Sequence, residues 1–176
     1  DIEVTHVNGG TECAPTRTFT IVATDACGNK ATRTVTFVRN CAPCVPASFN
    51  FNDSTATSGS AGNIRTFTVG GVSVKASAFS RTSSGAWATA YLGQYSGGLG
   101  VTDGSEGTGS GNSHTVDNVG RDNYVLFEFN QPVVLKTATL GYVVTDSDMS
   151  VWIGTFANPY ANHLNLSDAV LGSFSH

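Results

Sequence analysis

Short runs in which apolar and polar residues alternate recur along almost the whole chain, and turn-forming residues separate them. A period of two is typical of β-strands with one buried face, whereas helices repeat their apolar residues every three or four positions. Gly, Ser, Asn and Asp between the runs suit tight turns. Only residues 163–174, HLNLSDAVLGSF, favour a short helix, with Ser167 as its N-cap. The pattern predicts an all-β protein built from antiparallel strands.

The composition narrows the classes of function. The chain has 176 residues, of which 40% are hydrophobic and 12% charged, so it can bury a core and is not disordered as a whole. The net charge of -4 and the scattered Lys and Arg residues argue against a nucleic-acid partner. No apolar run reaches the roughly 20 residues of a transmembrane helix, and the first residues do not form a signal peptide. We therefore expect an interior piece of a longer precursor, or a trimmed mature form.

All four cysteines lie in the first quarter of the chain: Cys13, Cys27, Cys41 and Cys44. The CAPC stretch has the spacing of redox and zinc motifs, but it precedes Val-Pro, and no second CxxC or paired His follows. Disulfides are the favoured interpretation, with a pairing that the sequence leaves open. They predict an oxidising setting outside the cytoplasm.

Residues 17–40 form a predicted β-hairpin. Phe19, Ile21 and Ala23 alternate with polar or smaller neighbours, ACGNK supplies a turn, and Val35 and Phe37 alternate again. The stretch TIVATDACGNKATRTVTFV resembles the closing two strands of the HYR-type immunoglobulin-like repeats of bacterial surface proteins. The resemblance implies a partial immunoglobulin-like β-module over residues 1–40.

This module is too short to be a complete sandwich. An immunoglobulin-like fold needs about seven strands, and at most three can be drawn from residues 1–40. So few strands cannot bury both faces of a sheet, and their edges carry unpaired N–H and C=O groups. The segment could pack on a second domain, its missing strands could come from another chain, or they were removed with the rest of a precursor. Strand donation between subunits would give a polymer.

A linker and a larger domain follow. Residues 41–48, CAPCVPAS, are a predicted linker because they hold two Pro and two Cys. Residues 49–176 are predicted to form an antiparallel β-sandwich of jelly-roll type. Its predicted strands lie at 48–53, 63–81 with a hairpin turn at VGGV, 87–95, 123–130, 133–144 and 149–156.

Two loops concentrate negative charge. Residues 97–122 and 145–150, with the strand between them, hold seven of the thirteen acidic residues. Carboxylates at this density repel one another, and Ca²⁺ takes six to eight oxygen ligands. We therefore predict a calcium site at which residues 117–122 and 146–148 meet, with these ligands: Asp117, Asn118, Asp122, Asp146 and Asp148. The alternative is that these residues only form turns through side-chain hydrogen bonds.

A second resemblance covers residues 97–156. GGLGV, HTVDNVGRDNYVLFEF and VVLKTATLGYVVTDSDMSVWI resemble, in this order, a domain common in exported bacterial proteins that end in PEP-CTERM sorting tags. The resemblance implies an exported β-domain, extracellular or on the cell surface, and little biochemistry beyond that.

His114 in the same stretch has three interpretations: a metal ligand, a catalytic base, or a residue that fixes the loop by bonding Asp117. We favour the last. Hydrolysis would need paired carboxylates at a defined separation, or a Ser or Cys nucleophile in a recognisable elbow, and neither pattern is present. The sequence therefore predicts a protein that is not an enzyme.

Aromatic residues offer another surface: Trp87, Tyr91, Tyr95, Tyr142, Trp152 and Tyr160. Such rings stack on sugars when they share an exposed face. The spacing of four between the first three puts them on one face of a strand, and we favour core packing for that face over a sugar platform.

Together these features predict an extracellular structural or adhesive protein of a bacterial surface or matrix, a subunit of a β-strand-linked filament with loops ordered by calcium. Its partners would be copies of itself or other surface proteins, and polysaccharide. The alternative function is a carbohydrate-binding module of a secreted protein.

Overall fold

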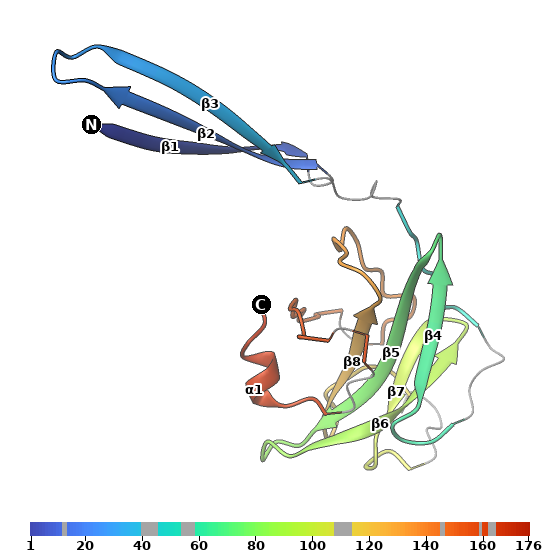
Figure 1. The fold of residues 1–176 in the computed structure, drawn as a ribbon. Coiled ribbons are helices and arrows are strands. Elements are labelled where there is room, and N and C mark those ends of the chain that lie inside the picture. The colour runs from blue at the N-terminus through green and yellow to red at the C-terminus, as the bar shows by residue number, and fades with distance from the viewer. Residues whose placement is uncertain are drawn as a thin grey trace. The chain divides into compact units, whose positions relative to one another are not determined.

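The computed structural model describes residues 1–11, 14–39, 46–53, 59–107, 114–144, 147–158, 160–161 and 165–176. The chain divides into two units, Asp1–Pro46 and Ala47–His176 (Figure 1). Every strand pairing is antiparallel and the one helix described has four residues, so the prediction of an all-β, sandwich-like antiparallel fold is confirmed. Among the described residues no helix is long and apolar enough to cross a membrane.

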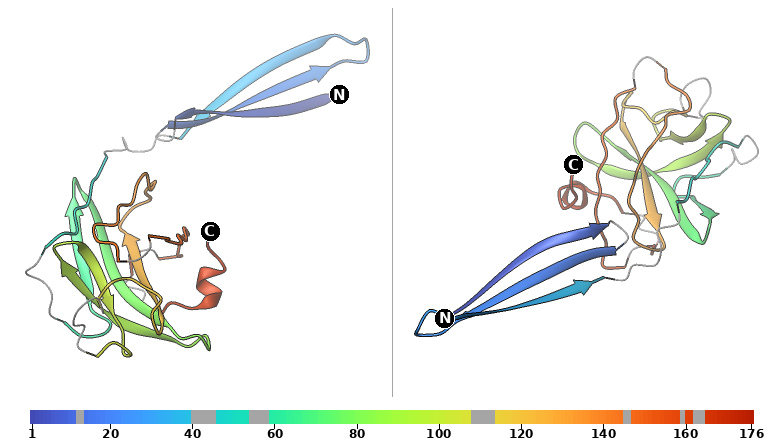
Figure 2. Two further views of the ribbon diagram at one scale, coloured as in Figure 1. Left: turned by 180° about the vertical axis from the view of Figure 1, so that it is seen from behind. Right: turned by 90° about the horizontal axis from the view of Figure 1, so that it is seen from above.

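The N-terminal unit is one three-stranded sheet, which we call sheet A. Its strands are β1 (Ile2–Thr11), β2 (Ala14–Thr24) and β3 (Lys30–Val38), in the order β1-β2-β3. The predicted hairpin at 17–40 is confirmed as β2 and β3. Its turn is held by Asp25, whose Oδ1 accepts hydrogen bonds from the backbone N–H groups of Cys27 and Asn29 at 2.8 and 2.9 Å. The start of β1 lies beside this turn (Figure 2), where the Asp1 amino group donates to the Thr24 carbonyl at 2.7 Å.

The C-terminal unit is built around one central strand. Its strands are β4 (Ile64–Val69), β5 (Val72–Arg81), β6 (Trp87–Tyr95), β7 (Gly98–Thr102) and β8 (Asp122–Phe129). One edge of β5 pairs with β8, and its other edge pairs first with β4 and then with β6. The predicted hairpin at VGGV is confirmed, because Gly70 and Gly71 both have positive φ, as a two-residue turn of the primed type requires.

β6 pairs with two different strands along its length and thereby helps to enclose the core. Its first residues, up to Ala90, pair with β5, and from Tyr91 onward it pairs with β7. The core enclosed in this way consists of Ala76, Ala78, Ala90, Leu92 and Val101, with Phe67, Leu99 and Val125 packed against it. Residues 49–51 cover the same face nearer β4, since the Phe51 ring lies 4.9 Å from that of Phe67 and 5.4 Å from that of Phe127.

The opposite face of β5 is covered by the C-terminal part of the chain. Lys75 lies over the ring of Tyr160, and Arg81 binds Asp168. Asp168 begins the helix α1 (Asp168–Leu171), whose predicted N-cap Ser167 accepts a hydrogen bond from the Val170 N–H at 3.2 Å. β5 is therefore covered on both faces, and its Phe79 is the largest fully buried side chain among the described residues.

Three predicted strands do not form. Residues 48–53 and 133–144 contain no strand, and in 149–156 only Ile153 makes an isolated bridge, to Ser175. These stretches have strand-like composition, but a strand also needs a neighbouring edge and a face to pack on. Much of 133–144 is instead exposed, including Val134 and Tyr142. In these three stretches the alternation was therefore a wrong indicator of strand pairing.

Candidate functional site

The register of sheet A separates its side chains into two unlike faces. On one face Val4 lies opposite Ile21, and His6 lies opposite Phe19, which in turn lies opposite Val35. We call this the apolar face, after its main residues: Ile2, Val4, His6, Phe19, Ile21, Ala23, Ala31, Val35 and Phe37. The same face also carries Asn8, Arg17 and Arg33. The other face, which we call the threonine face, consists mainly of Thr5, Thr16, Thr18, Thr20, Thr32, Thr34 and Thr36.

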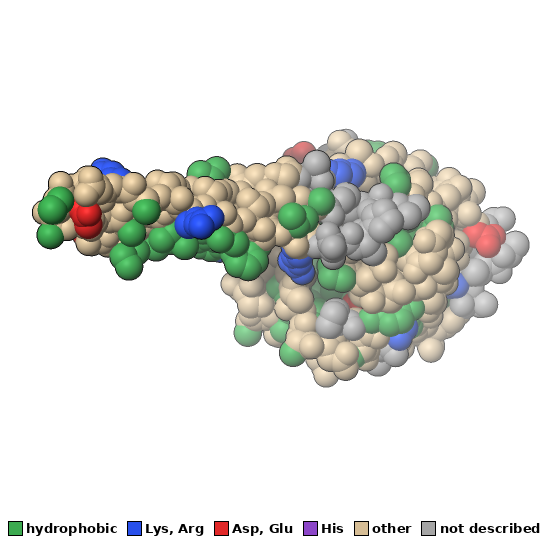
Figure 3. All heavy atoms as spheres, turned by 45° about the horizontal axis from the view of Figure 1, so that its top comes forward, with side chains coloured by type: hydrophobic (Ala, Val, Ile, Leu, Met, Phe, Trp, Pro, Cys, Tyr) green, Lys and Arg blue, Asp and Glu red, His purple; other side chains and the backbone are tan. Residues whose placement is uncertain are grey.

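The apolar face is exposed. Ile2 is 70% exposed, Phe37 is 61% exposed and Val4 is 58% exposed, and no described residue of this unit is buried. The rings of His6, Phe19 and Phe37 lie next to one another, with centroids 5.7 and 5.8 Å apart. Figure 3 shows hydrophobic side chains along sheet A. An exposed apolar surface of this extent marks an interaction site in a soluble protein.

The two edges of sheet A are also open. In the described part of the unit β1 and β3 each pair on one side only, with β2. An open edge presents backbone N–H and C=O groups that another strand can bind. In the described part of the unit, sheet A thus has an exposed apolar face and two outer edges that pair with no further strand.

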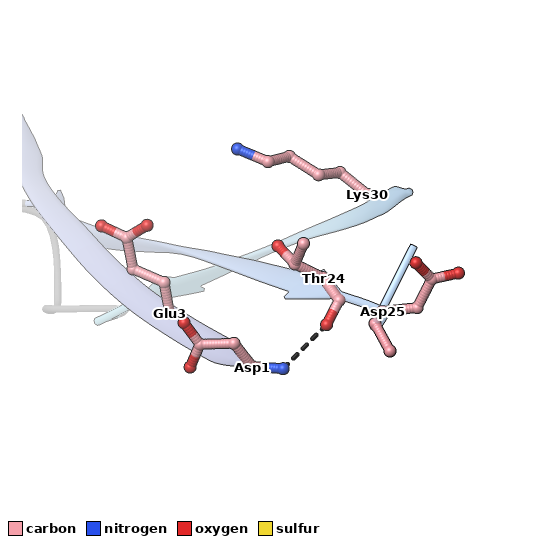
Figure 4. Close-up of a pocket in the computed structure, with 6 residues that line it drawn as sticks. Asp1, Glu3, Thr24, Asp25 and Lys30 are labelled. Carbon is pink, nitrogen blue, oxygen red and sulfur yellow. Dashed lines mark hydrogen bonds between the residues drawn. The ribbon is translucent and has the colours of Figure 1, made fainter. Parts of the chain in front are cut away.

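Charge is distributed unevenly along sheet A. Asp1, Glu3, Asp25 and Lys30 lie at the end that contains the β2–β3 turn, where they line a shallow polar hollow (Figure 4). The N-terminal ammonium group and Arg33 add positive charge to the same end. Hydrogen bonds from Asn29 lower the pKa of Asp25, so this carboxylate stays ionised. Arg17 and Arg39 lie at the opposite end, where Arg17 donates to Asn8 and the Arg39 N–H donates to Pro15.

The predicted disulfide cysteines are only partly described. Cys27 lies in the exposed turn between β2 and β3 and is free. Cys13, Cys41 and Cys44 lie outside the described residues, so pairing among them stays a prediction. Residues Ala14 and Arg39, which stand closest to them in the sequence, lie at the end of sheet A away from Cys27. A disulfide needs two Cα atoms within about 7 Å of each other. Cys27 and Ala14 lie at opposite ends of β2, which is about 30 Å long.

The predicted calcium ligands take different partners. Asp117 accepts hydrogen bonds from the Thr115 hydroxyl at 2.7 Å and from the Val119 N–H at 2.9 Å, as a turn-forming aspartate does. Asp122 begins β8 and lies 3.9 Å from Arg81. Asn118 and Asp148 are exposed, and Asp146 lies outside the described residues. Among the residues that the structure describes, no three His, Cys, Asp or Glu side chains form a metal-holding group. Calcium binding at these residues stays a prediction.

A different pair of carboxylates, Asp103 and Glu106, lies at the start of the loop between β7 and β8, residues 103–121, which we call the acidic loop. Asp103, whose side chain is fully buried, accepts hydrogen bonds from the Ser105 N–H and hydroxyl, both at 2.6 Å, and from Asn123 at 3.0 Å. The Glu106 carboxylate accepts from the Asp103 N–H at 2.7 Å, while the Glu106 N–H donates to the backbone carbonyl of Asp103 at 3.2 Å. This arrangement has one of the two side-chain hydrogen bonds of a capping box and forms without a helix. The spacing of three between the two residues, in DGSE, is the signal that our sequence reading counted only as charge.

The environment shifts the pKa values of Asp103 and Glu106 in opposite directions. Burial alone would raise the pKa of Asp103, but hydrogen bonds from Ser105 and Asn123, with the charge of Arg121, outweigh it and the pKa is lowered. Burial also raises the pKa of Glu106, and the charges of Asp103 and Asp117 add to this increase against one hydrogen bond from the Asp103 N–H. The loop is therefore held by one firmly ionised carboxylate and one that ionises less readily.

His114 does not have the neighbour we expected. The hydrogen bonds described at the Asp117 carboxylate come from Thr115 and Val119, whereas the His114 ring packs on Tyr95 with centroids 4.3 Å apart. Gly100 in β7 explains this position, since a Cβ there would collide with the carbonyl of His114. The glycine of the GLGV stretch thus lets the loop approach the sheet.

The aromatic residues divide among separate places. Trp87, Tyr91 and Tyr95 share a face of β6 as predicted, but that face is half-buried and the buried face holds Ala90 and Leu92. The prediction that this stripe packs in the core is therefore wrong.

One aromatic group does form on the C-terminal unit. Trp87 contacts Tyr124 at 4.7 Å, Tyr124 contacts Trp152 at 6.0 Å, and Trp152 stacks on His176 at 4.7 Å. We call this the aromatic row; its first three rings are half-buried and His176 is exposed.

No family model, curated protein or solved structure matches this chain. The two family resemblances in the sequence accordingly stay predictions, and the interpretation of the sites depends on their geometry.

Proposed function

We propose that this chain is an exported structural or adhesive protein of a bacterial surface or matrix, and that it assembles with other subunits through sheet A. The observation that carries the proposal is the exposed apolar face of that sheet, with Ile2, Val4 and Phe37 each more than half exposed. Leaving such a face in water is unfavourable by about 25 cal/mol for each Å² of apolar surface. A partner that covers it stabilises the unit.

The open edges and the chemistry of the chain support the same proposal. A strand from a neighbouring subunit can add to β1 or β3 through backbone hydrogen bonds, and repetition of this contact produces a filament. The low charge content and the cysteines suit an extracellular location. The proposal assigns no enzymatic role.

Negative-stain imaging and light scattering of the full chain test this proposal. We expect regular oligomers or filaments that grow with protein concentration. A chain that stays monomeric over the whole micromolar range, alone and mixed with an extract of surface proteins, would contradict an assembly function.

Carbohydrate binding is the second proposal, and the aromatic row favours it. Its rings lie beside Asp168 and Arg81, which gives the mixture of aromatic faces and polar groups that sugars bind. A glycan array tests it with Trp152→Ala, which removes a ring of the row, and Tyr142→Ala, an exposed tyrosine outside the row, as control. We expect the first substitution to abolish binding and the second to preserve it. An array without any signal removes this proposal.

A further inference from the structure

We infer that the start of the acidic loop and the adjoining ends of β5 and β8 form a calcium site, with oxygen ligands from Asp103, Glu106, Asn123 and Ser80. The site shares no ligand with the one predicted from the sequence. The inference goes beyond the proposed function, since it does not depend on how sheet A assembles.

Asn123 connects the two ends of the acidic loop. Its backbone N–H donates to the carbonyl of Asp117 at 2.7 Å, and its Nδ2 donates to Oδ2 of Asp103 at 3.0 Å. Asp103 is joined in turn to Glu106, whose Oε2 accepts from the Asp103 N–H at 2.7 Å. One hydrogen-bonded network therefore contains three acidic residues, and the Asp103 side chain in it is fully buried.

Two buried oxygen atoms beside this network have no hydrogen-bond partner among the residues that the structure describes: Ser80 Oγ and Asn123 Oδ1. Ser80 is 1% exposed and lies directly opposite Asn123 in the pairing of β5 with β8. Such cross-strand neighbours project from the same face of a sheet, with Cβ atoms about 5 Å apart. The Ser80 hydroxyl thus lies on the same side as the Asn123 amide, which binds Asp103. Burying a polar atom without a partner is unfavourable, so both oxygens indicate a ligand.

The charge of the network favours a divalent cation. Burial is the main cause of the raised pKa of Glu106, and the charges of Asp103 and Asp117 add to it, so the three carboxylates interact. The Arg121 Nε lies 3.9 Å from Oδ1 of Asp103, which is too far for a hydrogen bond, and it compensates this charge only in part. Three carboxylates and one guanidinium leave two negative charges, which one divalent cation neutralises.

The ligand types favour Ca²⁺ among the divalent cations. Ca²⁺ binds about six to eight oxygen atoms in irregular geometry and completes its shell with backbone carbonyls and water, whereas Mg²⁺ requires a nearly ideal octahedron. Zinc favours nitrogen and sulfur ligands, and the site contains neither. The described residues form no group of three His, Cys, Asp or Glu ligands, and the proposed site uses two such residues with neutral oxygens.

Two matched serine variants of the full chain test the site. Ser80→Ala removes a proposed ligand, and Ser77→Ala makes the same change three residues earlier, on the opposite face of β5. Both hydroxyls are buried and lack a partner among the described residues, so neither substitution breaks a hydrogen bond of the folded chain. Circular dichroism should therefore show wild-type strand content in both variants. Thermal unfolding is then recorded in EDTA and in millimolar Ca²⁺.

We expect Ca²⁺ to raise the unfolding midpoint of the wild type and of Ser77→Ala equally, and Ser80→Ala to lose most of this shift. Isothermal titration calorimetry with Ca²⁺ should give the same order of affinities. An equal shift in all three proteins would mean that the ion binds elsewhere and overturns the inference. A wild type without any shift also overturns it, since a bound water molecule would then satisfy the two oxygens.

Glu106→Gln gives a readout that a purely structural role would not produce. Without Ca²⁺ the substitution removes repulsion between carboxylates, so at pH 7 the variant should unfold above the wild type in EDTA. With Ca²⁺ it removes a charged ligand, and the order of the two proteins should reverse. The same order in both solutions overturns the assignment of Glu106.

Asp148→Asn separates the inference from the site predicted from the sequence. Asp148 is exposed and belongs to the predicted ligands only. We expect this variant to keep the full calcium shift of the wild type. Loss of the shift in Asp148→Asn, with the shift retained in Ser80→Ala, would mean that calcium binds at the predicted site and overturns the inference.

Discussion

Arg81 and Asp168 lie 87 positions apart in the sequence and are joined by two hydrogen bonds, from Nε to Oδ1 at 2.8 Å and from Nη2 to Oδ2 at 3.1 Å. The Trp87 indole N–H donates to the same Oδ1 at 3.0 Å. One carboxylate thus holds α1 against both β5 and β6. This contact, with Trp152 on Tyr124, fixes the C-terminal part of the chain over the sheet.

Asp168→Asn should destabilise the protein in a pH-dependent way. Hydrogen bonds from Arg81 and then Trp87 lower the pKa of Asp168 below its ordinary value of 3.8. A lowered acid pKa adds stability above pH 3.8 that is lost as the pH falls through the folded-state pKa. Thermal unfolding should show the variant below the wild type at pH 7, with a difference that shrinks below pH 3.8. A difference that persists unchanged in acid would contradict this role.

Leu92→Ala tests the core beneath β6. Leu92 is fully buried, so its truncation should lower the free energy of unfolding by about 2–5 kcal/mol in a urea titration. Leu140→Ala is the matched control, because Leu140 is 45% exposed in the stretch that forms no strand; we expect a change within about 0.5 kcal/mol. Equal effects would mean that residues 133–144 are packed as firmly as the core.

The contributions of Glu106 and Asp103 to the stability of the protein should change with pH in opposite directions. The pKa of Glu106 is raised above 4.5, chiefly by burial, so its ionisation costs stability as the pH rises through the folded-state pKa. Glu106→Gln keeps an acceptor for the Asp103 N–H and should be more stable than the wild type at pH 7, with no advantage near pH 4.

Asp103→Asn is the counterpart. It should lower stability at pH 7 by about 1–3 kcal/mol, because buried donors lose a charged acceptor. The pKa of Asp103 lies below 3.8, so this deficit should fade only as the pH drops below that value. If the stability of both variants changed with pH in the same direction, the pKa values of Asp103 and Glu106 would not be shifted in opposite directions.

Gly100→Ala should displace the loop at His114. The added methyl group meets the His114 carbonyl, and overpacking of this kind costs about 1–3 kcal/mol. Gly104→Ala is the control, because its nearest neighbour is an Arg121 side-chain nitrogen 3.9 Å away. Chemical denaturation should separate the two variants. If both are tolerated, the approach of the loop to β7 is not required for folding.

Calcium binding can be tested on the intact protein. If the predicted site at Asp117, Asn118, Asp122, Asp146 and Asp148 forms, millimolar Ca²⁺ should raise the midpoint of thermal unfolding relative to EDTA, and Mg²⁺ should do so less. An unchanged midpoint would contradict the predicted site.

The sequence predicted those elements whose determinants are local. Alternation and turn chemistry are properties of a few consecutive residues, and they identified β2, β3, the Gly70–Gly71 hairpin and the cap at Ser167. The sequence did not predict contacts between residues that are far apart in the chain. The Asn63 side chain binds the N–H and C=O of Leu92, each at 2.8 Å, where β6 leaves β5. Nothing near Asn63 in the sequence indicates that contact.

The site residues divide in the same way. The acidic character of the loop was evident from its composition, but the selection of Asp103 and Glu106 depends on burial between β7 and the start of β8, which composition does not report. For β6 the sequence predicted the wrong buried face. The large rings of Trp87, Tyr91 and Tyr95 indicated that their face was buried, whereas the structure buries the face of Ala90 and Leu92.

β5 is hydrogen-bonded on both edges and covered on both faces, so its amide protons reach water only when the whole C-terminal unit opens. Hydrogen exchange should therefore be slowest in this strand and should report the global free energy of unfolding. The segment after β8 binds β5 directly, through Lys75 and Arg81. The segment before β4 packs on Phe67 of β4 and Phe127 of β8, the two strands that pair with opposite edges of β5, so both segments depend on that strand.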